Sequence, residues 1–131
     1  MDRVDLKTIK NNRHITIGSH GFSHTSLKRL NYEGLVEEIV SSKKILENEL
    51  GRAVNFFAYP HGVYSQMCLA ILKEAGYKAA FTGRTGVLER LSSDYKINRT
   101  EISYHSSSTL EFRKKINGSY DWTILKDRIF N

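Results

Sequence analysis

The segment that most restricts the fold is an almost unbroken apolar and aromatic run at residues 54–59, which ends at the only proline of the chain, Pro60. A continuous apolar run of this length is typical of a strand that is buried on both faces, as in a parallel sheet. Because proline cannot donate a ladder hydrogen bond, the strand is expected to give way to a loop at Pro60.

Strands and helices are predicted to alternate along the chain. Apolar residues recur at helical spacing in residues 32–50 and 66–75, and a glycine, Gly51 or Gly76, follows each run. The other predicted elements are the end of a helix at 2–10, short strands at 15–17, 78–82 and 95–97, and a last helix at 109–116. This alternation favours parallel βαβ units and hence an α/β fold, in a single domain spanning residues 1–131.

The ends and the polar side of the two longer helices are also predictable. Asn31 and Ser65 stand where an N-cap residue is expected. The charged residues of the first helix are expected to face solvent: Glu37, Glu38, Lys43, Lys44 and Glu47. The lone cysteine, Cys68, lies in an apolar helical stretch and is expected to be a small core residue rather than a nucleophile.

Two histidines, His20 and His24, follow the predicted strand at 15–17. In parallel α/β folds, the loops at the carboxyl ends of strands carry the chemistry. Two imidazoles four positions apart can close on one divalent metal, so metal-assisted hydrolysis is the leading hypothesis. Ser19 and Ser23 each precede one histidine and are expected to orient the rings through hydrogen bonds. The competing interpretation is that both histidines are structural.

Charge and hydropathy restrict the class of partner. The net charge is +6 and the pI about 9.5, but no basic run is longer than three residues. Dispersed charge of this kind favours a solvated surface over a phosphate track, so a nucleic-acid adaptor is disfavoured. No stretch approaches the roughly 20 apolar residues of a membrane span, and the first residues lack the apolar core of a signal peptide.

Several motifs resemble one family. Residues 17–24 (IGSHGFSH) resemble the His-(Ser/Thr)-x-x-His metal motif of the NodB-type polysaccharide deacetylases. Residues 56–62 (FFAYPHG) resemble the Phe-Ala-Tyr-Pro-x-Gly form of that family's next motif. The likeness continues, in the family's order, through residues 73–77 (KEAGY), 97–99 (INR) and 118–122 (GSYDW).

This resemblance implies a fold and an activity. The expected fold is a partial, distorted (β/α) barrel with mostly parallel strands and its first strand missing, since the chain has about half the roughly 250 residues of a full barrel. The implied activity is a hydrolase that removes N-acetyl groups from amino sugars of a polysaccharide or oligosaccharide. Members of the family often act at the cell envelope, but this sequence does not indicate a location.

The resemblance also implies roles for individual residues. His20 and His24 would bind a divalent metal, with zinc expected ahead of cobalt, nickel or manganese. One wall of the sugar groove would be formed by Tyr59, Pro60, His61 and Gly62. The backbone N–H of His61 would donate a hydrogen bond to the oxyanion of the reaction.

The chain departs from the family pattern at its acidic and acid-base motifs. The family's Asp-Asp pair, which supplies the base and the third metal ligand, is expected before His20, and this sequence has no such pair there. Asp2 and Asp5 fall on the predicted helix and are not assigned these roles. The late Leu-x-His motif is not recognisable, and His105 is its nearest candidate.

Two single positions also differ from the family pattern. Gly21 replaces a serine or threonine, and Ala58 replaces the arginine found in other branches. The change at Gly21 is tolerable, but the missing acidic motif leaves two histidines without a carboxylate, which predicts a weak or inactive deacetylase. The missing strand is also expected to expose a sheet edge, which a second copy of the chain or an upstream segment would cover.

A second hypothesis is a noncatalytic carbohydrate-binding remnant of such an enzyme. In this interpretation Tyr59, Tyr64 and Trp122 would offer flat rings to sugars. Retained glycan binding in the presence of a chelator would favour it over the enzyme.

Overall fold

The computed structural model describes residues 6, 8–84, 93–100, 102 and 108–117. Its helical elements are η1 (Leu27–Arg29), α2 (Tyr32–Val36), η2 (Glu37–Ser41), α3 (Ser42–Leu50), η3 (Pro60–Gly62), α4 (Gln66–Glu74) and α5 (Thr109–Ile116). The predicted helix at 32–50 is continuous, although its middle part, η2, is a π-helical turn. The predicted helices at 66–75 and 109–116 are confirmed as α4 and α5.

The sheet is parallel, as the sequence predicted. Strand β1 (Phe56–Ala58) pairs with β2 (Ala79–Phe81), and α4 connects them, so the chain contains a βαβ unit. A single parallel bridge continues the sheet on each side, between Ser19 and Phe57 and between Phe81 and Ile97. The α/β class is therefore confirmed.

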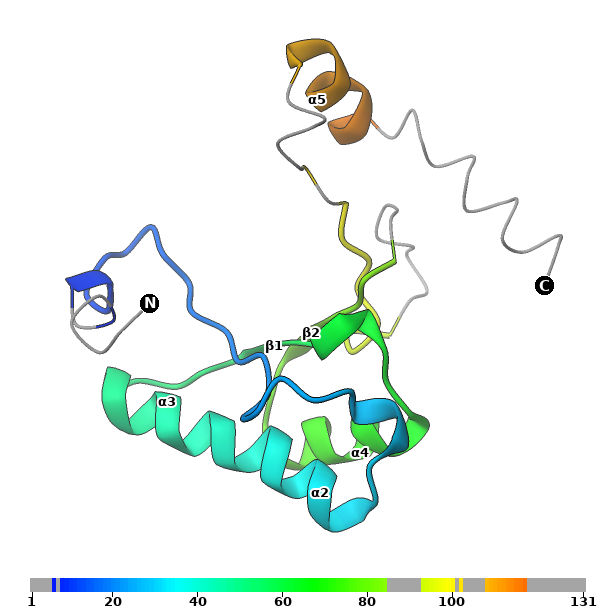
Figure 1. The fold of residues 1–131 in the computed structure, drawn as a ribbon. Coiled ribbons are helices and arrows are strands. Elements are labelled where there is room, and N and C mark those ends of the chain that lie inside the picture. Colours follow the sequence, from blue (N-terminus) through cyan, green and yellow to red (C-terminus); the bar gives the residue numbers. More distant parts are fainter. Residues whose placement is uncertain (1–5, 7, 85–92, 101, 103–107, 118–131) are drawn as a thin grey trace, which may run out of the picture.

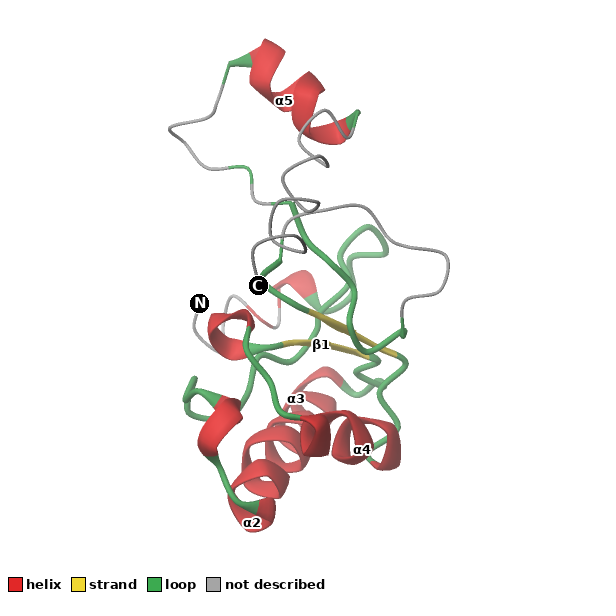
Figure 2. Cartoon of the chain, turned by 90° about the vertical axis from the view of Figure 1, so that its right-hand side faces the viewer, coloured by secondary structure: helices red, strands yellow, loops and turns green. Residues whose placement is uncertain are grey.

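Helices α2, α3 and α4 lie together on one side of β1 and β2, whereas α5 lies apart from them (Figures 1 and 2). The strands turn Phe57 and Ala80, which are fully buried, into the core. The alternate residues of both strands point to the other face. The core also contains apolar side chains from the helices and from the segments beside them: Leu27, Leu35, Ile39, Leu50, Val54, Ile71 and Leu72.

Local signals explain where the helices begin and end. The Asn31 side chain accepts a hydrogen bond from the Gly34 N–H at 3.0 Å, as expected of an N-cap. Gly51 ends α3 with a φ of 67°, a left-handed conformation that glycine adopts without strain. At the start of α4, the N–H of Ser65 donates to the buried sulfur of Cys68. Cys68 is therefore the core residue that the sequence predicted.

The strand expected at 15–17 does not form, and this prediction was wrong. The chain pairs with β1 two residues later, at Ser19, whose N–H donates to the Phe56 carbonyl at 2.9 Å. A Cβ atom on Gly18 would lie 3.0 Å from the same carbonyl oxygen. Gly18, the residue after the expected strand, is where the two backbones approach closely.

The polar side of α3 also differs from the expectation. The Glu47 carboxylate accepts a hydrogen bond from the Val54 N–H at 2.9 Å and pairs with Lys43 Nζ, also at 2.9 Å. Lys43 Nζ in turn donates to the Val54 carbonyl. The Lys43 and Glu47 side chains therefore hold the backbone of Val54, just before β1, and do not simply face solvent. None of the described helices is long and apolar enough to cross a membrane.

Candidate metal centre

His20 and His24 lie side by side, directly after the bridge between Ser19 and β1. Their ring centroids are 4.9 Å apart, and the rings meet at 63°. Both side chains are exposed. The four-residue spacing therefore brings the two imidazoles together on the surface, in the loop where the sequence analysis expected a site.

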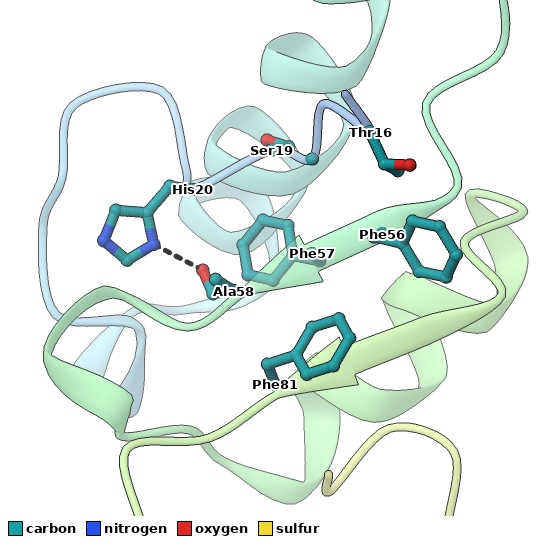
Figure 3. Close-up of a pocket in the computed structure, with 8 residues that line it drawn as sticks. Thr16, Ser19, His20, Phe56, Phe57, Ala58 and Phe81 are labelled. Atoms are coloured by element: carbon teal, nitrogen blue, oxygen red, sulfur yellow. Dashed lines mark hydrogen bonds between the residues drawn. The ribbon is translucent and has the colours of Figure 1, made fainter. Parts of the chain in front are cut away.

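The ring of His20 is oriented by the backbone of β1. Its Nδ1 lies 2.7 Å from the carbonyl oxygen of Ala58 (Figure 3). A carbonyl oxygen can only accept, so Nδ1 carries the hydrogen, and in the neutral ring the lone pair is then on Nε2. A backbone carbonyl that fixes the tautomer in this way is the usual partner of a histidine that binds metal.

The loop between the two histidines is held by Glu38, whose side chain is only 6% exposed. Its carboxylate accepts hydrogen bonds from the N–H groups of Phe22 and Ser23 and from the Ser23 hydroxyl. Burial alone would raise the pKa of Glu38, but these hydrogen bonds outweigh burial and lower it. Glu38 was expected to face solvent, and this prediction was wrong.

The serines beside the histidines do not orient the rings, so that prediction was also wrong. The Ser19 hydroxyl donates to the Ser42 hydroxyl at 2.8 Å, and the Ser23 hydroxyl donates to Glu38. Both serines therefore join the loop to the helix behind it.

The loop after β1 presents His61 and Gly62 and buries its first two residues. Tyr59 and Pro60 are both fully buried, and the Tyr59 hydroxyl donates to the Tyr95 carbonyl at 2.9 Å. These two side chains therefore support the loop from within instead of forming its surface. Burial also raises the pKa of Tyr59, so its phenol stays neutral.

The ring of His61 adjoins the histidine pair, a contact that the sequence analysis did not predict. Its ring centroid is 4.7 Å from that of His24. Within the described residues, no hydrogen bond occupies its backbone N–H, the group that the resemblance assigns to the oxyanion. The backbone of His61 is left-handed, with a φ of 56°, which the sequence analysis did not predict.

Of the aromatic residues of the second hypothesis, the two that the structure describes, Tyr59 and Tyr64, do not form an open surface for sugar rings. Tyr59 is buried, and Tyr64 stacks on it with 4.6 Å between the centroids, so one face of Tyr64 is covered. Trp122 lies outside the described residues, as do Asp2, Asp5 and His105.

A pocket of about 460 Å³ opens beside His20 and is lined by residues of both strands, Phe57 among them (Figure 3). Its wall is mostly apolar and includes Thr16, Gly18, Phe56, Ala58 and Phe81. His20 therefore belongs both to the candidate metal centre and to the lining of a mostly apolar cavity.

The imidazole groups present are of a type that binds divalent transition metals, but there are fewer of them than a metal site usually needs. Imidazole nitrogen is a common ligand for zinc, and the Nε2 of His20 is available. Across the described residues, however, no group of three or more His, Cys, Asp or Glu side chains is arranged to hold a metal ion. Of the described side chains, only the adjacent His20 and His24 are candidates for ligands here, one short of the three that a hydrolytic zinc site usually has.

Comparison with known proteins assigns the family. The family profile described as polysaccharide deacetylase matches residues 3–80, more than half of the chain. The chain belongs to the polysaccharide deacetylase family. The resemblance seen in the sequence motifs is thereby confirmed. No curated protein is similar enough to this family member to count as a match.

Solved structures share the fold of this polysaccharide deacetylase family member. Deacetylase PplD of Streptococcus pyogenes, solved in complex with acetate, has a TM-score of 0.76 and 23% identity, over 84% of this chain and 49% of that one. BC0361, a polysaccharide deacetylase from Bacillus cereus, has a TM-score of 0.77 and 24% identity, over 88% and 36%. IcaB from Ammonifex degensii has a TM-score of 0.69 and 18% identity, over 85% and 52%. The chain spans about half or less of these structures.

Proposed function

We propose that this chain carries the histidine pair of a metal-dependent polysaccharide deacetylase, a hydrolase that removes N-acetyl groups from amino sugars of a polysaccharide. The observation that carries the proposal is the 4.9 Å separation of the His20 and His24 rings. The hydrogen bond from His20 Nδ1 to the Ala58 carbonyl supports it, because it leaves Nε2 as a ligand atom.

His20 and His24 would hold the cation, for which Zn²⁺ is the first choice and Co²⁺, Ni²⁺ or Mn²⁺ are alternatives. When bound, such a cation polarises an amide carbonyl and acidifies a water molecule. The backbone N–H of His61 would donate to the oxyanion as the acetamide carbonyl becomes tetrahedral. His61 and Gly62 would line the sugar groove, and the buried Tyr59 and Pro60 would keep their loop in place.

We also propose that the chain by itself is a weak deacetylase. A hydrolytic zinc site usually has three protein ligands and one open position. Two histidines without a carboxylate are expected to bind zinc loosely, so that little of the protein is loaded at micromolar zinc.

The proposal is tested by binding first and by turnover second. Calorimetric titration of the metal-free chain with ZnCl₂ should give a weak, single-site isotherm that is lost in His20→Ala and His24→Ala. His14→Ala is the matched control, since His14 is exposed and lies in the preceding turn. Acetate release from N-acetylglucosamine oligomers is expected to be slow. A zinc isotherm that survives both substitutions would overturn the proposal.

We propose further that another strand completes the sheet beside Ser19. Both the N–H and the carbonyl of Ser19 face β1. In an extended chain the neighbouring Gly18 and His20 therefore turn their backbone groups to the opposite side, where no described strand pairs with them. A second copy or an upstream segment would supply the strand. Sedimentation velocity showing a stable monomer at high concentration would exclude the second copy.

A further inference from the structure

Among the described residues, Glu38 is the one buried carboxylate beside the candidate metal centre, and all of its described side-chain hydrogen bonds reach a single loop. The distances from its Oε2 are 2.8 Å to the Phe22 N–H and 3.0 Å to the Ser23 N–H. The Ser23 hydroxyl donates to Oε1. A buried charge is costly unless it is fully hydrogen-bonded, and here the partners are consecutive residues between the two histidines.

The loop is shaped to receive this carboxylate. Gly21 has a φ of 85°, and a Cβ atom at this position would lie 2.9 Å from Glu38 Oε2. An L-residue here would be strained and would also crowd the carboxylate. The glycine that replaces the family's serine or threonine therefore permits the close approach of Glu38.

The same helix holds the loop at its other end. Ser42, one turn after Glu38, accepts a hydrogen bond from the Ser19 hydroxyl and donates to the Glu38 carbonyl. His20 is thus preceded by one attachment to the helix, and His24 is preceded by another at Ser23. Both imidazoles extend from a segment that is fixed on each side.

We propose that Glu38 is a positioning residue for the histidine pair: its carboxylate fixes the loop so that the His20 and His24 rings keep their spacing before a metal arrives. The inference rests on the proposed function, because it presupposes that the pair binds metal. Glu38 acts through Phe22 and Ser23 and does not touch the metal itself.

The test compares two neighbouring carboxylates in the full chain. In Glu38→Gln, the amide presents an NH₂ group where the carboxylate accepted hydrogen bonds, so the loop loses part of its anchor. Loss of such an outer partner typically weakens metal affinity on the order of 10-fold to 100-fold. We expect a loss of about 10-fold in zinc affinity by calorimetry, together with a changed absorption spectrum of bound Co²⁺. Glu37→Gln alters an exposed neighbour and is the matched control.

A merely structural role for Glu38 would lower the melting temperature but leave the zinc affinity and the Co²⁺ spectrum of the folded chain unchanged. That result in folded Glu38→Gln would overturn the inference. If the unsubstituted chain binds no zinc, the proposed function fails, and the inference fails with it.

If Glu38→Gln does not fold, the variant Ser23→Ala tests the positioning role of Glu38 in its place. This variant removes only the hydroxyl bond to Glu38 and keeps the two backbone bonds. We expect it to weaken zinc binding several-fold, and an unchanged affinity would overturn the inference.

Discussion

The ring of His24 lies edge-on to the ring of His61, with 4.7 Å between the centroids and 66° between the planes. Both residues also have a left-handed backbone, with φ values of 61° and 56°. This conformation costs a residue with a Cβ atom roughly 1–2 kcal/mol. Strain and ring contact thus coincide where the two loops of the candidate metal centre meet, as is common at functional sites.

Replacing His24 should separate this strain from metal binding. We expect His24→Gly to be more stable than His24→Ala by about 1 kcal/mol, because glycine adopts a positive φ without steric cost. Both variants should lose zinc binding to the same extent. Urea denaturation of the metal-free proteins measures the difference.

The control for His24 is His14, which is exposed and is not among the residues with positive φ. His14→Gly should be no more stable than His14→Ala in the same urea denaturation experiment. Equal stability of the two His24 variants would show that the backbone there is not strained.

Gly62 is expected to be intolerant of any side chain. A Cβ atom on Gly62 would lie 2.5 Å from both the N and the Cα of Gly83, and backbone atoms cannot move aside as a flexible side chain can. We expect Gly62→Ala to destabilise the chain by about 3 kcal/mol through combined strain and overpacking. Thermal unfolding followed by circular dichroism checks this.

Gly76→Ala is the matched comparison for Gly62→Ala. Gly76 has a φ of 76°, similar to the 70° of Gly62, but a Cβ atom there would meet nothing within 4 Å. Its cost should be about 1 kcal/mol, from strain alone. Two equal losses would mean that Gly83 yields to the new side chain.

Helices were more predictable from the sequence than strands. The bounds of α4 and α5 follow from apolar spacing and from local signals such as Ser65, which act within one segment of the chain. The pairing at Ser19 depends on how closely Gly18 can approach Phe56, a residue distant in sequence. No pattern within residues 15–19 contains that information, so the bridge was expected too early.

The residues of the candidate site that belong to a sequence motif could be predicted. A supporting residue on another element could not be predicted in this way. His20 and His24 were found from their spacing. Glu38 was missed because a carboxylate was taken to face solvent. Its position three residues after Leu35 and four before Ser42 puts it on the inward helical face, and this spacing was the available signal.

The hydroxyl of Tyr59 should matter for stability although the residue lies beside a predicted substrate groove. It donates to the Tyr95 carbonyl at 2.9 Å, and its side chain is fully buried. Tyr59→Phe would leave that carbonyl without its partner, at a cost of about 1–2 kcal/mol in the free energy of unfolding. Tyr32→Phe, at a residue that is 51% exposed, should change it by less than about 0.5 kcal/mol. A neutral Tyr59→Phe would show that water replaces the phenol.

The last prediction concerns acid stability and follows from Glu38. The hydrogen bonds from Ser23 and Phe22 outweigh burial and hold the pKa of Glu38 below its ordinary value of 4.5. A carboxyl whose pKa is lower in the folded than in the unfolded state stabilises the fold above the unfolded pKa. This stabilisation is lost as the pH falls through the folded pKa. We therefore expect the metal-free chain to exceed Glu38→Gln in stability by about 1–2 kcal/mol near pH 7.

That advantage should persist down to about pH 5 and shrink below 4.5, as Glu38 takes up a proton in the unfolded and then the folded chain. Urea denaturation at a series of pH values measures it, with Glu37→Gln expected to stay within about 0.5 kcal/mol of the unsubstituted chain near neutral pH. A gap that keeps its full size below pH 4.5 would mean that the charge of Glu38 is irrelevant. The shape of the residue, not its ionised form, would then hold the histidine loop.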